Sequence, residues 1–174
     1  MPITPSSDDE FFEAIRAEDP LGAVVRAHIH IEARLSQVVD ALTPHPRDLP
    51  SLRYEQRAKL AVALGLDGRI LGPLLELGYI RNAFAHKLDV KLTDGMVDKL
   101  FASFDEEDRG VIVEAYQLTW AQLEKAGMPP YEKTDARHKF ITMAVAMDKF
   151  LLTAESEARA SRPSNNSLER SRER

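Results

Sequence analysis

Apolar residues recur at intervals of three and four along most of this chain, and this spacing constrains the fold more than any other feature. It gathers apolar side chains on one face of an α-helix, whereas a half-buried strand would alternate at every second residue. Glycine is scarce and β-branched runs, which favour strands, are few. The clearest helical face is formed by Leu21, Val24, Val25, His28, Glu32, Leu35, Val39 and Leu42. The sequence therefore predicts an all-α fold, an up-and-down helical bundle of about five to seven helices.

Capping residues and prolines divide this pattern into helices. We expect a short helix through Phe11, Phe12 and Ile15, and a long one that Asp19 caps and that Thr43-Pro44-His45-Pro46 ends. The further helices are expected from Leu49-Pro50-Ser51 to Gly65, from about Ile70 to about His86, after Thr93 as a cap, from about Glu106 to Ala126, and from about Asp135 to Ala158.

The chain is predicted to form one domain with two extensions. With 174 residues it is long enough for one real core and too short for two. Residues 1–18 form an N-terminal extension with the short helix, 19–159 the bundle, and 160–174 a disordered tail. The tail consists mainly of Ser, Asn and Arg and offers almost nothing apolar to bury. We interpret it as a solvated segment that folding does not require, or alternatively as an arm that contacts nucleic acid.

Composition excludes several kinds of site. There is no cysteine, which rules out disulfides, thiolate zinc sites, iron–sulfur clusters and cysteine nucleophiles. No set of metal ligands stands out, because His28 and His30 lie on different helix faces, so we expect no metal and no cofactor. The chain has neither a secretory signal nor an apolar run long enough for a membrane span, which favours a cytoplasmic protein. Its net charge of −5 means that any phosphate must be bound by a local cluster.

One such cluster lies near the end of the central helix, in the run Arg81-Asn82-Ala83-Phe84-Ala85-His86. Asn82 and His86 are four residues apart and share a helix face, with Arg81 one step around the helix. A guanidinium binds phosphate oxygens with two hydrogen bonds, a carboxamide can orient the phosphate, and an imidazole can transfer a proton near neutral pH. The alternative is a structural arginine paired with an acid, beside a histidine that ends the helix.

Two polar residues on the first long helix lie where apolar ones are expected. His28 and Glu32 fall on its apolar face, as Arg81 does on the face of the central helix. A charge on a buried face needs a partner, because leaving it unpaired there is costly. We therefore expect the two helices to face each other and Glu32 to pair with Arg81. This pair would support the cluster, or would be a structural ion pair and nothing more.

The run from Tyr79 to Lys87 resembles the signature helix of the HEPN superfamily, in which an arginine precedes a histidine by four to six residues and a polar residue often follows the arginine. Within that superfamily the chain looks most like the mannitol operon repressor family. The resemblance covers roughly residues 19–125, although only the six-residue motif is specific. Lys87-Leu88-Asp89 follows the histidine where some toxin members have His-x-Tyr, which argues against the paired toxin–antitoxin branch.

This resemblance implies a helical bundle that dimerises across the motif helices and cleaves RNA without a metal. By position, Arg81 would bind the scissile phosphate, Asn82 would position it and His86 would assist proton transfer, with His28, Glu32 and Lys87 in support. The mannitol repressor branch implies instead a non-catalytic transcriptional regulator that acts through a protein partner or DNA. A third alternative is a helical interaction module in which the motif holds a dimer together.

The pattern of the central helix also favours a homodimer. Its apolar residues cover more of the helix surface than one packing partner needs: Leu71, Leu74, Leu75, Leu77, Ile80 and Phe84. A polar cluster at the end of such a helix would be costly against an internal core. We therefore expect a two-fold dimer in which Arg81 and His86 of both chains line one cleft.

Overall fold

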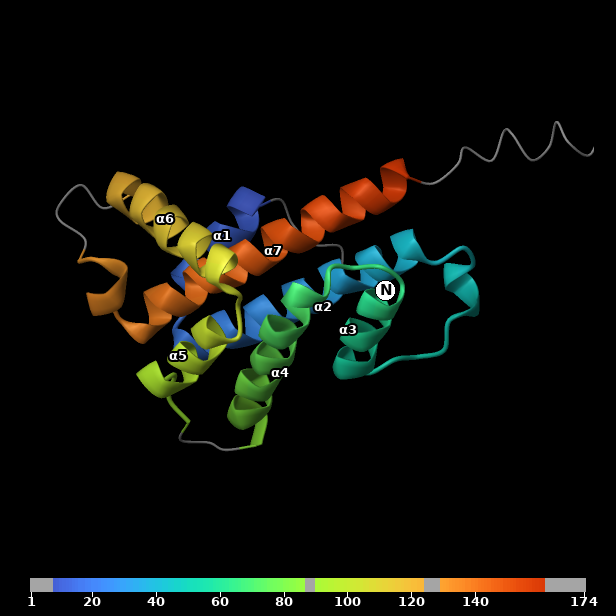
Figure 1. Ribbon diagram of the computed structural model, residues 1–174. Helices are drawn as coiled ribbons and strands as arrows, with labels where there is room; N and C mark the ends of the chain where they lie inside the picture. Colours follow the sequence, from blue (N-terminus) through green and yellow to red (C-terminus); the bar gives the residue numbers. More distant parts are fainter. Residues whose placement is uncertain (1–7, 87–89, 124–128, 162–174) are drawn as a thin grey trace, which may run out of the picture.

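The computed structural model describes residues 8–86, 90–123 and 129–161, without the side chains of 8, 9, 86 and 120–123. These ranges contain seven α-helices, three short 3-10 turns and no strand, which confirms the all-α helical bundle (Figure 1). The helices are α1 (Asp8–Ala17), α2 (Pro20–Leu42), α3 (Tyr54–Ala63), α4 (Leu71–His86), α5 (Asp94–Ala102), α6 (Glu106–Leu123) and α7 (Ala136–Ala160). The predicted tail lies almost entirely outside the described residues, as does the predicted end of the sixth helix at Ala126.

The helix starts that the sequence predicts are confirmed where a side chain caps them. Asp19 accepts a hydrogen bond from the backbone N–H of Gly22 at 2.7 Å, and a proline follows it. The Thr93 hydroxyl accepts one from Met96 at 3.4 Å, and Asp135 accepts one from His138 at 3.0 Å. Each cap supplies an acceptor to a backbone N–H that has no partner within its own helix.

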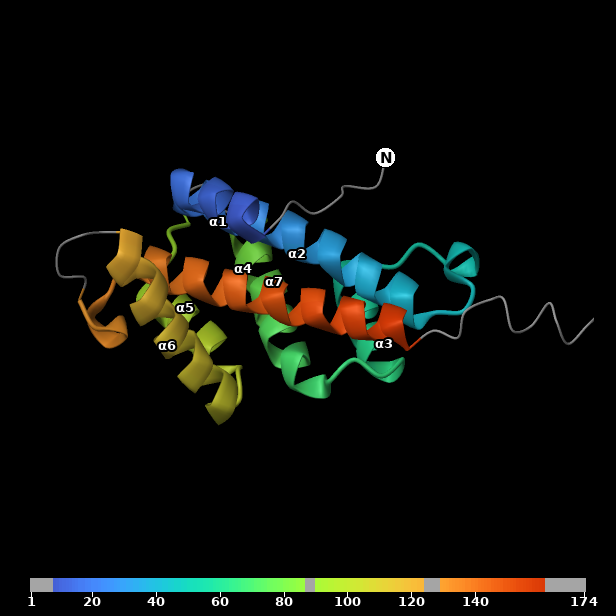
Figure 2. The ribbon, with the colours of Figure 1, turned by 90° about the horizontal axis from the view of Figure 1, so that it is seen from above.

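The two longest helices, α2 and α7, pack against each other and run in the same direction (Figures 1 and 2). Polar contacts between them show this direction. Arg137, near the start of α7, donates to the carbonyl of Glu18, just before α2. Further along, His30 Nε2 lies 3.0 Å from Asp148 Oδ1. Contacts thus advance together along both helices, and the other helices complete the core around this pair.

The buried face of α2 agrees with the predicted one in part, because Val24, His28, Leu35 and Val39 are buried as expected. Leu21 and Val25 were expected in the core, but their exposed fractions are 49% and 39%. The wholly buried residues include Ala27, Ile31 and Val38 instead. The reason is that α7 covers α2 on one side while α3 and α4 cover it on another, so the buried arc is wider and turned away from Leu21.

Helix α3 begins later than predicted, at Tyr54. The side chain of Gln56 accepts a hydrogen bond from the backbone N–H of Arg53 at 3.0 Å, which fixes the first turn at this point and leaves Leu49-Pro50-Ser51 outside the helix. Helix α3 ends as predicted, just before Gly65. Gly65 adopts a φ of +114°, which breaks the helix and disfavours any residue with a side chain. In the described ranges we find no helix long and apolar enough to cross a membrane.

Candidate functional site

Helix α4 carries the predicted motif, and its core contacts fix where the motif lies. Leu74, Leu77 and Ile80 are buried and anchor the helix in the bundle. Gly78 packs against the ring of Tyr54 so closely that a Cβ there would lie 3.2 Å from Tyr54 Cε1. This close approach between α3 and α4 accounts for a glycine in the middle of a helix, where it costs about 1 kcal/mol relative to alanine.

The last turns of α4 present the motif to solvent. Arg81 and Asn82 are both exposed, and Nη1 of Arg81 donates a hydrogen bond to Oδ1 of Asn82 at 3.0 Å. The carboxamide therefore orients the guanidinium. His86 is the last residue of α4. Its side chain and the whole of Lys87 lie outside the described residues, so their predicted roles stay predictions.

Behind the motif lies a second group of polar residues, contributed by α2 and α3. His28 on α2 is buried, and its ring packs against that of Tyr54 with centroids 4.4 Å apart and an angle of 43° between the planes. Nδ1 of His28 lies 3.8 Å from Oε2 of Glu32. The sequence therefore correctly predicted that His28 lies on the inner side of α2, at the level of α4.

The predicted ion pair between Glu32 and Arg81 is wrong. Oε1 of Glu32 lies 3.0 Å from Nη1 of Arg57 on α3, and Arg57 also donates to the carbonyl of Leu52 at 3.1 Å. The error has a physical cause: α3 packs against α2 beside Glu32 and brings its own arginine there. Among the described residues, no carboxylate pairs with Arg81, whose side chain contacts Asn82 instead.

The pKa of His28 is lowered from its usual value of 6.5. Burial is the main cause, because an imidazolium loses hydration there. The carboxylate of Glu32 opposes this effect, and the positive charge of Arg81 adds to it. The influence of Arg81 on His28 shows that the motif and the buried histidine belong to one electrostatic environment, in which His28 is favoured as the neutral imidazole.

Tyr54 leaves one polar atom without a partner. Its hydroxyl is buried and makes no hydrogen bond to any described residue. Burial, with the nearby charge of Glu32, raises the pKa of this phenol. The group is therefore a neutral donor and acceptor held between α2, α3 and α4.

Sequence reasoning missed Tyr54 and Arg57. Arg57 follows Tyr54 by three residues, so both project from neighbouring positions on the same side of α3. That spacing was a usable signal, but it does not by itself show that Arg57, and not Arg81, is the partner of Glu32. The described residues contain no cluster of three or more His, Asp and Glu that could hold a metal ion.

A second buried polar group lies between α2 and α7. Oδ1 of Asp148 lies 3.0 Å from His30 Nε2 and 2.9 Å from Arg34 Nε, while Phe11 stacks on His30 with centroids 3.8 Å apart. Burial raises the pKa of Asp148, but the hydrogen bonds and charges of His30 and Arg34 outweigh this effect and lower it overall. These contacts join two core helices, and we assign them a structural role.

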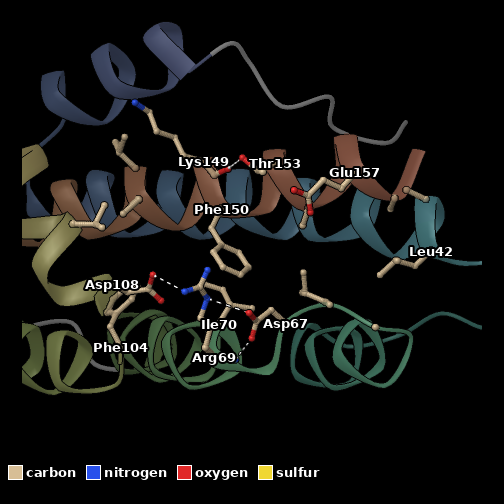
Figure 3. Close-up of a pocket in the computed structure, with 18 of the residues that line it drawn as sticks. Leu42, Asp67, Arg69, Ile70, Phe104, Asp108, Lys149, Phe150, Thr153 and Glu157 are labelled. Atoms are coloured by element: carbon tan, nitrogen blue, oxygen red, sulfur yellow. Dashed lines mark hydrogen bonds and ion pairs between the residues drawn. The ribbon is translucent and has the colours of Figure 1, made fainter. Parts of the chain in front are cut away.

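A groove of about 1430 Å³ lies between α6, α7 and the 3-10 turn Gly68–Ile70. Arg69 lies beneath the ring of Phe150 in this groove (Figure 3). Its Cζ is 5.2 Å from the centroid of that ring. Asp67, Asp108 and Glu107 all lie within ion-pair distance of this guanidinium. No predicted site residue lines the groove. The arginine of the groove is therefore already paired with carboxylates, whereas Arg81 is paired with none among the described residues.

Comparison with protein-family models, with curated proteins and with solved structures finds no match to this chain. The resemblance to the HEPN superfamily therefore rests on the sequence motif at the end of α4 and on the pattern of helices around it.

Proposed function

We propose that this protein is a metal-independent endoribonuclease in which Arg81, Asn82 and His86 form the site. One observation carries the proposal. Arg57 neutralises Glu32, so the exposed guanidinium of Arg81 is paired with a neutral carboxamide and keeps its full charge for an anion. A phosphodiester suits that arrangement, because it accepts two parallel hydrogen bonds from arginine. Because the overall charge of −5 does not attract a polyanion, binding of a phosphate has to come from a local cation such as Arg81.

The proposed reaction needs neither metal nor water. The 2′-hydroxyl oxygen of the RNA attacks the adjacent phosphorus and its proton passes to a base, while the bond from phosphorus to the 5′-oxygen breaks and that oxygen takes up a proton. The products are a 2′,3′-cyclic phosphate and a 5′-hydroxyl. Arg81 would stabilise the charge that develops on the phosphoryl oxygens, Asn82 would hold Arg81 in place, and His86 would carry the proton.

A homodimer would complete this site. Exposed apolar residues on α2 favour such a contact: Leu21, Val25 and Ile29 have exposed fractions of 49%, 39% and 42%, and their spacing of four places them on one side of the helix. Helical geometry puts this side next to His28 and Glu32, and therefore next to the inner part of the proposed site. A second copy that covers these residues would bring two motifs together.

The test is RNA cleavage in EDTA. Purified wild type should cut mixed single-stranded RNAs, and Arg81→Ala and His86→Ala should each lose most of that activity. Arg159→Ala is the matched control, because Arg159 is an exposed arginine on α7 that pairs with Glu155 and lies outside both the site and the exposed face of α2. All variants should keep the helical circular dichroism of the wild type.

Two results would count against the proposal. Equal cleavage by wild type and His86→Ala would identify a contaminating nuclease. RNA binding without any cleavage would favour the alternative, a non-catalytic regulator. The salt dependence of that binding would then be measured, and a slope near zero of the logarithm of the binding constant against the logarithm of the salt concentration would exclude binding driven by phosphate.

A further inference from the structure

Tyr79 is the most exposed large hydrophobic side chain among the described residues, with an exposed fraction of 60%. It lies on α4, three residues before Asn82. On a helix this spacing places two side chains on the same face, roughly 4.5 Å apart along the axis. An aromatic ring therefore stands open to solvent beside the carboxamide that orients Arg81.

The cation nearest in sequence to this ring is Arg81, two residues further along α4. Its guanidinium is exposed and donates a hydrogen bond to the carboxamide of Asn82 at 3.0 Å. Lys59 on the neighbouring helix α3 is less available, because it already pairs with Glu55 at 2.6 Å. Tyr79 therefore lies beside the Arg81–Asn82 pair on its own helix, and Arg81 is accessible to a polyanion.

We propose that Tyr79 is a stacking platform for an unpaired base next to the phosphate that Arg81 holds. This inference rests on the proposed function and deepens it, because it names the substrate as single-stranded or looped RNA. Aromatic side chains bind single strands by stacking on base faces, with little dependence on sequence. Inside a duplex each base face is covered by its neighbours, so the ring would have nothing to bind.

The local geometry favours a base over an apolar protein partner for this ring. Arg81 and Asn82, which follow it on α4, are both exposed. A protein interface would have to desolvate these groups, whereas a nucleotide brings a phosphate for the guanidinium and a π face for the phenol. The base of a nucleotide therefore suits the exposed ring of Tyr79, and its phosphate suits the guanidinium of Arg81.

Binding of two oligomers tests the proposal. The first is a 2′-O-methyl octauridylate, which has no 2′-hydroxyl to attack and stays intact. The second is an abasic sugar–phosphate oligomer of the same length, which has the charge without the bases. Tyr79→Ala should bind the octauridylate about five- to 150-fold more weakly than wild type. It should bind the abasic oligomer as wild type does, and Tyr79→Phe should bind both normally.

Leu118→Ala is the matched control, because Leu118 on α6 has an exposed fraction of 58% and lies outside the proposed site. It should bind both oligomers like the wild type. The stacking proposal is overturned if Tyr79→Ala binds octauridylate normally, or if it loses both oligomers equally. If wild type binds neither oligomer, the proposed function fails together with the platform. If wild type binds both and Tyr79 has no effect, only the platform fails.

Discussion

Oε1 of Glu32 lies 3.0 Å from Nη1 of Arg57, so the acid on α2 is neutralised from α3 and not from α4. This pairing decides the charge of the candidate site. If Glu32 paired with Arg81, the motif would have no net charge to offer a phosphate. With Arg57 in that position, Arg81 keeps its charge and is held by Asn82.

Removing Arg57, the partner of Glu32, should therefore weaken anion binding at Arg81, although Arg57 itself lies on another helix. In Arg57→Gln the carboxylate loses its cation, and its charge acts on Arg81 instead. We expect about a two- to fivefold loss of affinity for an abasic oligomer at low salt, the scale of a partly exposed ion pair. Glu32→Gln combined with Arg57→Gln should restore binding, because the double variant has no stray charge. Unchanged binding by Arg57→Gln would contradict this account.

The pH behaviour of His28 reports on the same charges. Its folded pKa lies below the usual 6.5, so between these two values the unfolded chain binds more protons than the folded one. The free energy of unfolding should consequently fall as the pH drops through 6.5 toward the folded pKa, and His28→Gln should reduce this dependence. The measurement is thermal unfolding at pH values from about 5 to about 8.

Imidazole NMR titration separates the causes of that shift. Arg81→Ala should raise the pKa of His28 by removing a nearby positive charge, and Glu32→Gln should lower it further. An unchanged titration of His28 in Arg81→Ala would mean that the motif and the buried histidine do not share an electrostatic environment.

Two glycines on helices should respond in opposite ways to alanine. Gly110→Ala on α6 places its Cβ in open space, so it should stabilise the protein by up to about 1 kcal/mol. Gly78→Ala has the same helical benefit but puts a Cβ 3.2 Å from the Tyr54 ring, which must move. We expect it to lower the melting temperature. Equal stabilisation by both substitutions would show that α3 and α4 are less closely packed than described.

The sequence predicted what depends on neighbouring residues and missed what depends on distant ones. Helix starts at Asp19, Thr93 and Asp135 were predictable, because a cap and the N–H groups it binds lie within three residues of each other. The full extent of the buried face of α2 was not, because α7 covers part of it and lies more than a hundred residues away in the sequence. Asp148 shows the same limit, since nothing near it in the sequence indicates its contacts with His30 and Arg34.

The same distinction between local and distant contacts applies to the candidate site. Periodicity correctly placed Arg81 and Asn82 side by side near the end of α4, but it put Arg81 on the apolar face of that helix, whereas the structure leaves both side chains exposed. The partner of Glu32 depended on where α3 packs, which no local pattern encodes. The contribution of a second chain, and of His86 and Lys87, stays a prediction.

The central claim is that the end of α4 promotes attack by a 2′-hydroxyl on its own phosphodiester. Its most direct measurement compares an RNA that the protein cuts with the same RNA carrying one 2′-deoxy sugar at the cleavage position, both in EDTA. We predict that the RNA yields a 2′,3′-cyclic phosphate end, and that the deoxy version binds equally well but is not cut there. Cleavage that persists at the deoxy position, or cleavage that appears only when a divalent metal is added, would contradict the account.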